Sequence, residues 1–237
     1  MNSARRTSAR LMVIGVAASL SLLVACRGGA SGRVTSGADG EALAVVSEKE
    51  NPWFAAAISG SDAGLNAAAA SGAPMNVVAG RTRRTPLHYA ANVGNAGAVR
   101  FLVSRGAGVN TVDRDGRTAL LLACSGGKGP ASLALLEAGA DPNVRDRDQA
   151  TAIMFASRTG QVDAIRALMS RGANINAQNV NGKTALIFAA DQGQGESART
   201  LLQLGADPKI TDSKGRTALV YATAENRPEL VRILGGQ

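Results

Sequence analysis

The chain has 237 residues and a formal net charge of +8, from 26 Lys and Arg residues against 18 Asp and Glu residues. Hydrophobic residues make up 45% of the sequence but aromatic residues only 3%. A large globular core usually relies on the bulk of Phe, Tyr and Trp, so this composition favours small, closely packed helices instead. With one histidine and two cysteines, the chain has few side chains for acid–base catalysis and too few ligands for a zinc site.

Residues 1–25 are predicted to be an export signal. The first ten positions hold Arg5, Arg6, Arg10 and no acidic residue, and the uncharged segment LMVIGVAASLSLLVA follows. This apolar segment ends at Ala25, a length that is typical of a secretory signal and too short for a typical membrane span. Removal of residues 1–25 takes away those three arginines and no acid, so the net charge would fall from +8 to +5.

The junction Leu23-Val24-Ala25-Cys26 resembles the lipobox of bacterial lipoproteins. This resemblance implies that the signal is cut before Cys26, that the Cys26 thiol is lipidated, and that acyl chains hold the protein on a bilayer. Position +2 is Arg27 rather than Asp, which by the family's sorting rule implies the outer membrane, with the protein facing the periplasm. An ordinary cleaved signal beside a cysteine is the alternative. The Gly- and Ser-rich residues 26–51 are then predicted to be the lipidated cysteine and a flexible tether, which would reach roughly 25–30 Å.

From residue 52 onward, one motif is copied at a constant interval. Threonines, Gly-Ala pairs, asparagines and turn aspartates each recur in the same register, and such self-similarity is typical of repeat architectures. The threonines that show the interval are Thr85, Thr118, Thr151, Thr184 and Thr217.

Each copy is predicted to form two short helices followed by a loop. In the first copy, Thr85 caps a helix that begins at Pro86 and ends at Gly94. A second helix is expected at residues 96–104, and the segment GVNTVDRDG after it is expected to be a loop. Two helices of about two turns each cannot bury a core alone, so neighbouring copies must stack.

The segment TPLHYA, at residues 85–90, matches the T-P-L-H-x-A signature, and the chain resembles the ankyrin-repeat family over residues 52–237. The later copies TALLLA, TAIMFA, TALIFA and TALVYA keep Thr and Ala but lose Pro and His. The resemblance implies an all-α ankyrin-repeat solenoid of stacked helix-turn-helix units with hairpin loops. The expected units are an N-terminal cap at 52–79, repeats at 80–112, 113–145, 146–178 and 179–211, and a C-terminal repeat at 212–237.

His88, the single histidine, is predicted to be structural. Catalysis would need a paired nucleophile and an orienting group, and other copies place Leu, Met, Ile or Val at the same position. The ankyrin resemblance implies that His88 hydrogen-bonds near the loop and fixes the turn between units, beside the structural motif threonines. Cys124 is predicted to be a small buried thiol.

Other apparent motifs are predicted to be turns. The segment GKT at residues 182–184 resembles the end of a phosphate-binding loop, but Ala177 stands where that loop needs glycine. The Asp-Arg-Asp segments at 113–115 and 146–148 lack the glutamate of a calcium loop. No catalytic activity, cofactor or metal is therefore expected.

Basic residues precede most of the motif threonines and would form a ladder along the hairpin side of a stack. Simple solvation of these charges is one alternative, and contact with a partner is the other. The family resemblance implies a concave protein-binding face built from hairpin tips and first helices. Its candidate contact residues are Arg81, Arg84, Asn92, Arg114, Asp115, Arg117, Ser125, Arg147, Asp148, Arg158, Lys183, Asp191, Gln192, Lys214 and Arg216.

The resemblances together predict a membrane-anchored scaffold that binds a protein partner in the bacterial envelope. Two alternatives stay open: an inhibitor or immunity protein that neutralises a toxic envelope-acting enzyme, and a structural protein whose basic edge contacts anionic envelope polymers. Nucleic acid is not expected as a partner, because export separates the chain from it and the stacking aromatics of single-strand binders are absent.

Overall fold

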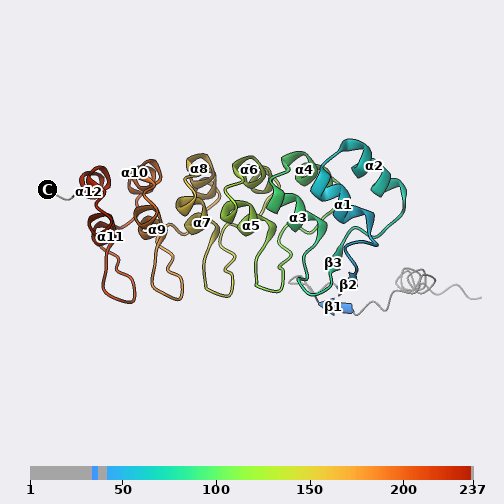
Figure 1. Ribbon diagram of the computed structural model, residues 1–237, viewed down its shortest axis with the longest axis horizontal. Helices are drawn as coiled ribbons and strands as arrows, with labels where there is room; N and C mark the ends of the chain where they lie inside the picture. Colours follow the sequence, from blue (N-terminus) through green and yellow to red (C-terminus); the bar gives the residue numbers. More distant parts are fainter. Residues whose placement is uncertain (1–33, 37–41, 236–237) are drawn as a thin grey trace, which may run out of the picture. The chain divides into compact units, whose positions relative to one another are not determined.

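The computed structural model describes residues 34–36 and 42–235, with side chains from Val45 onward. The predicted signal peptide and Cys26 lie outside the described residues. Within the described part, helices dominate and stack in a row, with long loops between successive pairs (Figure 1). This arrangement is the all-α repeat solenoid that the sequence predicts.

The stack begins with a capping pair of helices, α1 (Pro52–Ser59) and α2 (Asp62–Ala70). Asn51 caps α1 by accepting a hydrogen bond from the Trp53 backbone N–H, and Ser61 caps α2 in the same way through Gly64. Between them, Gly60 adopts a left-handed conformation with φ of 62°, which glycine takes without steric cost. The capping pair therefore has well-defined ends.

Five further helix pairs follow. In each pair the first, inner helix starts after a motif threonine in extended conformation, and the side chains of Thr118 and Thr184 cap their helices by accepting a backbone N–H. The pairs are α3 (Pro86–Val93) with α4 (Ala96–Ser104), α5 (Ala119–Ser125) with α6 (Gly129–Glu137), α7 (Ala152–Arg158) with α8 (Val162–Ser170), α9 (Ala185–Asp191) with α10 (Gly195–Gln203), and α11 (Ala218–Ala224) with α12 (Pro228–Ile233).

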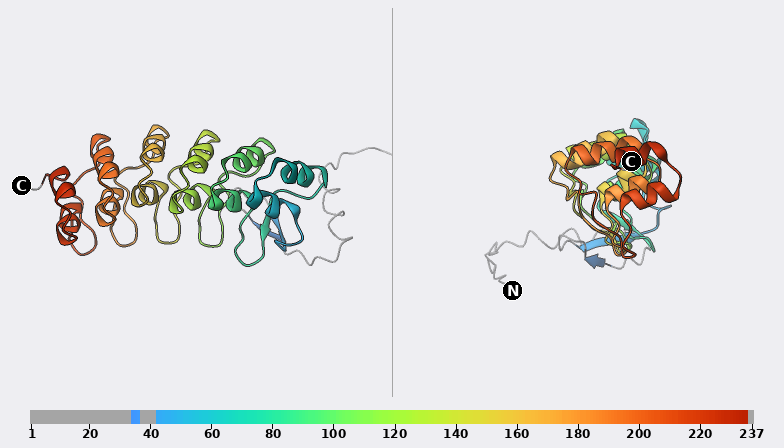
Figure 2. Two further views of the ribbon diagram at one scale, coloured as in Figure 1. Left: turned by 45° about the horizontal axis from the view of Figure 1, so that its top comes forward. Right: turned by 90° about the vertical axis from the view of Figure 1, so that its left-hand side faces the viewer.

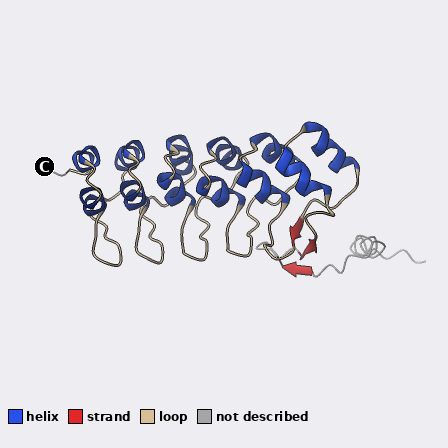
Figure 3. Ribbon diagram, in the orientation of Figure 1, coloured by secondary structure: helices blue, strands red, loops and turns tan. Residues whose placement is uncertain are grey.

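The helices form two layers. The inner helices α1, α3, α5, α7, α9 and α11 pack side by side, and the outer helices α4, α6, α8, α10 and α12 form the second row (Figure 3). Viewed along the row, successive pairs overlie one another with the loops on one side (Figure 2). We name these loops hairpins 1 to 5; they span residues 71–85, 105–118, 138–151, 171–184 and 204–217.

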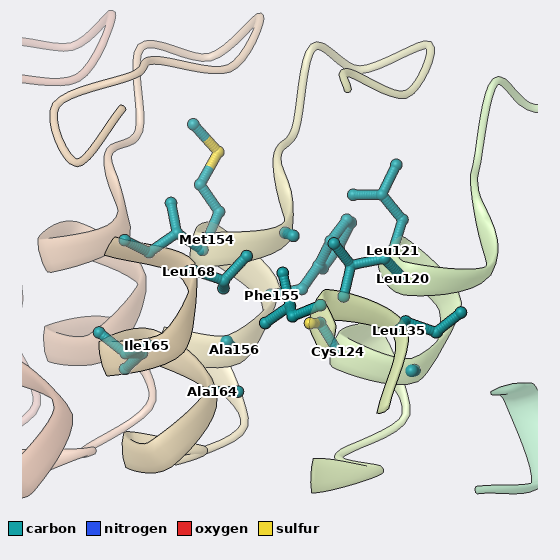
Figure 4. Close-up of a cluster of buried hydrophobic side chains, with 14 of the residues drawn as sticks. Leu120, Leu121, Cys124, Leu135, Met154, Phe155, Ala156, Ala164, Ile165 and Leu168 are labelled. Carbon is teal, nitrogen blue, oxygen red and sulfur yellow. The ribbon is translucent and has the colours of Figure 1, made fainter. Parts of the chain in front are cut away.

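The core runs continuously between neighbouring pairs. Leu120 and Cys124 of α5 lie fully buried beside the equally buried Leu135 of α6, and side chains of α7 and α8 meet them from the next repeat (Figure 4). Each fully buried leucine contributes roughly 1.5–3 kcal/mol. Because these partners come from neighbouring repeats, one repeat alone cannot complete its core.

A small sheet joins the first hairpin. β1 (Val34–Ser36) pairs antiparallel with β2 (Ala42–Val46), and β2 pairs parallel with β3 (Val77–Ala79). The flexible tether predicted for residues 26–51 is therefore wrong for residues 34–36 and 42–46. Val46 packs against the buried Phe54, and backbone pairing with β3, beyond the whole capping pair of helices, holds β2 in place.

Among the described residues, no helix is both long enough and apolar enough to cross a lipid bilayer.

Candidate functional site

His88 joins the first repeat to the second. Its Nδ1 accepts hydrogen bonds from the Thr85 backbone N–H at 3.1 Å and the Thr85 hydroxyl at 2.7 Å, which completes a capping box at the start of α3. On the other side of the ring, Nε2 donates to the Arg117 carbonyl oxygen at 3.0 Å, in hairpin 2. Both ring nitrogens are therefore engaged in holding the backbone in shape.

The environment of His88 keeps its ring neutral. The side chain is 1% exposed, and burial lowers the pKa of His88 to about 4, against smaller opposing effects of the Arg117 carbonyl and Asp113. A ring whose two nitrogens are both used has no free position for a substrate proton. The geometry is that of a structural group.

An aspartate or asparagine shapes each of hairpins 2 to 5. Oδ1 of Asp113 accepts the backbone N–H groups of Asp115 and Arg117 at 2.8 and 3.0 Å, which folds the tip of hairpin 2 into an Asx turn. Asp146, Asn179 and Asp212 make the same two bonds in hairpins 3, 4 and 5. Asp113 and Asp146, the first acids of the two Asp-Arg-Asp segments, are therefore already engaged by the backbone.

Ion pairs connect consecutive hairpins. Nε of Arg84 lies 3.1 Å from Oδ2 of Asp113 in the next repeat, and Nε of Arg117 lies 3.4 Å from Oδ2 of Asp146. The two carboxylates are only 2% exposed. Arg84 and Arg117, which the sequence predicts as contacts of a partner, thus form ion pairs inside the stack. Their contact with a partner stays a prediction.

The ion-pair series stops at the third repeat, where both partners change together. Ala150 stands at the position of Arg84 and Arg117, and Asn179 replaces the aspartate that would face it. An aspartate left there without its arginine would bury an uncompensated charge, which is costly. The paired loss of cation and anion avoids that cost.

Backbone hydrogen bonds also cross from hairpin to hairpin. The N–H of Arg114 donates to the Thr82 carbonyl oxygen at 2.9 Å, and the N–H of Arg147 donates to the Asp115 carbonyl oxygen at 3.1 Å. The same bond joins Val180 to Asp148 and Ser213 to Asn181. The hairpin tips therefore form a fixed row rather than five independent loops.

The tips present most of the predicted hairpin contacts to solvent. Arg81, Arg114 and Lys214 are exposed, as are Asp115, Arg147 and Asp148. Arg147 and Asp115 form an ion pair at 3.4 Å with both side chains more than half exposed, and such a pair contributes little to stability. The edge is basic with interspersed acids.

The C-terminal ends of the inner helices hold the other predicted contacts. Asn92 and Gln192 are exposed, while Ser125, Arg158 and Asp191 are half-buried. Nη2 of Arg158 donates to Ser125 Oγ at 3.3 Å between neighbouring repeats. These residues lie in successive units at one level of the inner helices, so the structure brings them into one row, which we name the inner-helix stripe.

Sequence reasoning missed an aromatic stripe beside these residues. One position of the inner helices, repeated at the interval of the motif threonines, holds Tyr89, Leu122, Phe155, Phe188 and Tyr221. Guanidinium groups of Arg117 and Arg158 lie 5.9 and 5.1 Å from the Phe155 ring centroid, within cation–π range. The same interval that revealed the threonines would have revealed this stripe.

A charged cluster extends the stripe to the last repeat. The Lys183 ammonium lies 4.6 Å from the Tyr221 ring centroid and 3.1 Å from Oδ2 of Asp191. Burial by itself would raise the pKa of Asp212, but hydrogen bonds from Arg216 and the Tyr221 hydroxyl outweigh it and hold this pKa below its usual range. The cluster is therefore charged and internally paired at neutral pH.

The remaining motifs occupy structural positions. Gly182 has a φ of 71° at the tip of hairpin 4, and Thr184 caps α9 through the Ile187 N–H, so the GKT segment forms a turn and a helix start. Cys124 is fully buried, and burial raises the pKa of its thiol to about 12. Neither motif offers a reactive group to a ligand.

Together, the inner-helix stripe and the hairpin row form one extended surface that crosses every repeat of the described structure. A search of curated proteins found no match to the chain. A family model described as "Ankyrin repeats (3 copies)" matches residues 53–146 and 132–212, two overlapping stretches that together cover more than half of the chain. With its period, helix pairs and hairpins all in agreement, the chain belongs to the ankyrin-repeat family.

Proposed function

We propose that the protein is a membrane-anchored scaffold that binds a protein partner in the bacterial envelope. Ankyrin repeats generally mediate protein–protein interactions, and no catalytic family is indicated for the chain. The observation that supports a binding role here is a row of cations beside the inner-helix stripe that rest on buried rings of the inner helices. Arg117 and Arg158 contact the ring of Phe155, and Lys183 contacts the ring of Tyr221, so these cations are held in place before any partner arrives.

Preorganisation makes this stripe suited to binding. Lys183 is 21% exposed and Arg117 is 31% exposed, so each keeps part of its side chain accessible while one face rests on a ring. A partner that docks here immobilises few side chains, and little conformational entropy is lost on association. Arginine is also among the side chains that carry most binding energy at protein interfaces.

The membrane anchor rests on the sequence. The lipobox-like junction before Cys26 favours lipidation of that cysteine, and the Arg27 that follows favours the outer membrane with the domain facing the periplasm. The Cys26→Ala variant should move the protein from the membrane fraction to the soluble fraction and abolish incorporation of labelled palmitate. Cys124 is an internal control, because this buried thiol remains in the variant. Continued labelling of Cys26→Ala would exclude the anchor.

The binding role is tested by recovery of a partner from cross-linked envelopes with the full-length chain. The double variant Asn92→Glu and Ser125→Glu adds two negative charges to the inner-helix stripe and should lose the partner. The matched control, Ser104→Glu and Ser170→Glu, adds the same charge at exposed positions near the ends of α4 and α8 and should keep it. Equal recovery by both variants would place the contact elsewhere.

An enzyme activity in the recovered complex that rises when the scaffold is removed would identify the inhibitor function instead.

A further inference from the structure

A basic groove opens where hairpins 1, 2 and 3 meet β2. It has a volume of about 410 Å³ and is lined by Arg81, Arg83, Arg114 and Arg147, with Asp113 and Val45 beside them. The groove lies at the hairpin tips, outside the stripe of inner-helix residues described above. Three successive repeats contribute to it, so it exists only in the assembled stack.

The carboxylates near the groove leave most of its positive charge in place. Among the described lining residues, Asp113 supplies the one carboxylate; it is paired with Arg84 at 3.1 Å and accepts two backbone N–H groups, so it is already engaged. Arg147 meets Asp115 at 3.4 Å, but both side chains are more than half exposed and water screens the pair. Arg81 and Arg114 are exposed to solvent. The groove is therefore suited to an anion.

Arg83 occupies a position that favours glycine. Its φ is 56°, in the left-handed region, and the equivalent positions in hairpins 2, 4 and 5 hold Gly116, Gly182 and Gly215 with φ between 71° and 75°. Hairpin 3 has Gln149 there, with φ of 59°. An L-residue with a side chain is strained in this conformation. Arginine at this site adds a cation to the groove at a cost in backbone energy, and such strain is often found at functional sites.

The spacing of the cations fits an extended peptide. Neighbouring repeats are separated by the helix packing distance of about 8–10 Å, and an extended chain in the polyproline II conformation brings every third side chain back to the same face after about 9 Å. Cations from three hairpins would therefore meet every third residue of a segment bound in that conformation. Asp115 and Asp148 between the arginines disfavour a continuous polyanion and favour a chain with spaced charges. The planar forks of arginine match carboxylates in two parallel hydrogen bonds.

We propose that this groove binds an extended segment of a protein partner that carries acidic residues at every third position. The proposal rests on the protein-binding function above and adds the chemistry of the segment that is recognised. Val45 supplies an apolar wall, so a residue between the acids would pack there.

The test measures the affinity of the full-length chain in detergent for a labelled nine-residue peptide with Glu at every third position, and for the same peptide with Gln. The Glu peptide should bind, the Gln peptide should not, and added salt should weaken binding. The variant Arg81→Gln, Arg114→Gln and Arg147→Gln should raise Kd by about tenfold or more. The matched control, Arg100→Gln, Arg166→Gln and Arg232→Gln, removes the same charge from exposed sites on α4, α8 and α12 and should bind as the unsubstituted chain does.

A further variant and a set of contrary outcomes make the test more specific. Arg83→Gly should lower the affinity while the stability of the fold stays equal or rises, because glycine relieves the strained φ. Equal binding of both peptides, equal loss in the control variant, or preferential binding of inorganic phosphate in the groove would overturn the proposal. If the chain does not bind the Glu peptide but still recovers a partner through the inner-helix stripe, the proposal about the groove alone is refuted. A chain that binds the peptide but recovers no partner would refute the scaffold function alone.

Discussion

His88 Nε2 lies 3.0 Å from the carbonyl oxygen of Arg117, so a side chain of the first repeat closes the hairpin that leads into the second. The same ring accepts the backbone N–H of Thr85 at the start of its own helix. One buried residue thus links a helix cap to the neighbouring unit. The cohesion of the stack depends on such links between repeats as well as on its apolar core.

Replacement of His88 by Ala should destabilise the fold. The variant loses the three hydrogen bonds of the ring and leaves a cavity at a site that is 1% exposed, so the free energy of unfolding should fall by about 2–4 kcal/mol. Urea denaturation measures the loss, and hydrogen exchange at the Thr85 amide should speed up. His88→Gln should lose less, because its amide oxygen can accept from the Thr85 N–H. An Ala variant as stable as the original chain would contradict the bridging role.

Stability should also depend on pH through His88. Its pKa is lowered by burial from 6.5 to about 4, so between these values the unfolded chain carries a proton that the folded chain does not. Stability therefore falls as the pH drops through this window, by about 3 kcal/mol in total, and the contribution is flat above pH 6.5. Comparison of the pH dependence of stability in the original chain and in His88→Gln isolates the contribution of His88, because the carboxylates titrate in both proteins. Identical pH profiles would show that His88 is not buried in neutral form.

Two motif threonines should respond in opposite ways to the same substitution. Thr118 Oγ1 accepts the Leu121 N–H at 3.3 Å, whereas Thr151 Oγ1 is buried with no hydrogen-bond partner among the described residues. Thr118→Val should cost about 1 kcal/mol, because a helix cap is lost. Thr151→Val should be neutral or stabilising, because it removes an unsatisfied hydroxyl at nearly constant volume. Thermal unfolding of the two variants measures the difference in stability. Equal losses of stability would contradict the assigned caps.

The gap in the series of ion pairs can be filled. The double substitution Ala150→Arg and Asn179→Asp recreates the Arg84–Asp113 arrangement between the third and fourth repeats. A double-mutant cycle should give a favourable coupling energy of about 0.5–1.5 kcal/mol, with Asn179→Asp alone destabilising. Denaturation of the four proteins at low and high salt supplies the cycle. Additive effects of the two substitutions on the free energy of unfolding would mean that such ion pairs do not stabilise the contact between repeats.

Local sequence signals predicted the helices well, because caps act over a few residues. Thr85, Pro86 and Gly94 bound α3 as expected, since each of them controls the backbone at its own position. Strand β2 was missed because its partner β3 lies beyond α1 and α2 in the chain, and such long-range pairing leaves no local periodicity.

The candidate site was predicted only in part. The positions of Arg84 and Asp113 were both noted in the sequence, but they belong to different repeats, and only the packing distance between repeats brings their side chains together. The joint change to Ala150 and Asn179 was visible as a pattern and could have indicated the pairing. The spacing of the motifs in the sequence does not show which cations form ion pairs inside the stack and which remain exposed. That division depends on how the repeats pack against one another.

Site-specific photo-cross-linking tests the central claim most directly. A photoreactive residue in place of Asn92, on the inner helix α3, should capture one discrete protein from intact envelopes. The same residue in place of Ser104, at the end of the outer helix α4, should capture none. Capture of the same protein from both positions, or from Ser104 alone, would contradict an account in which the inner-helix stripe is the binding surface.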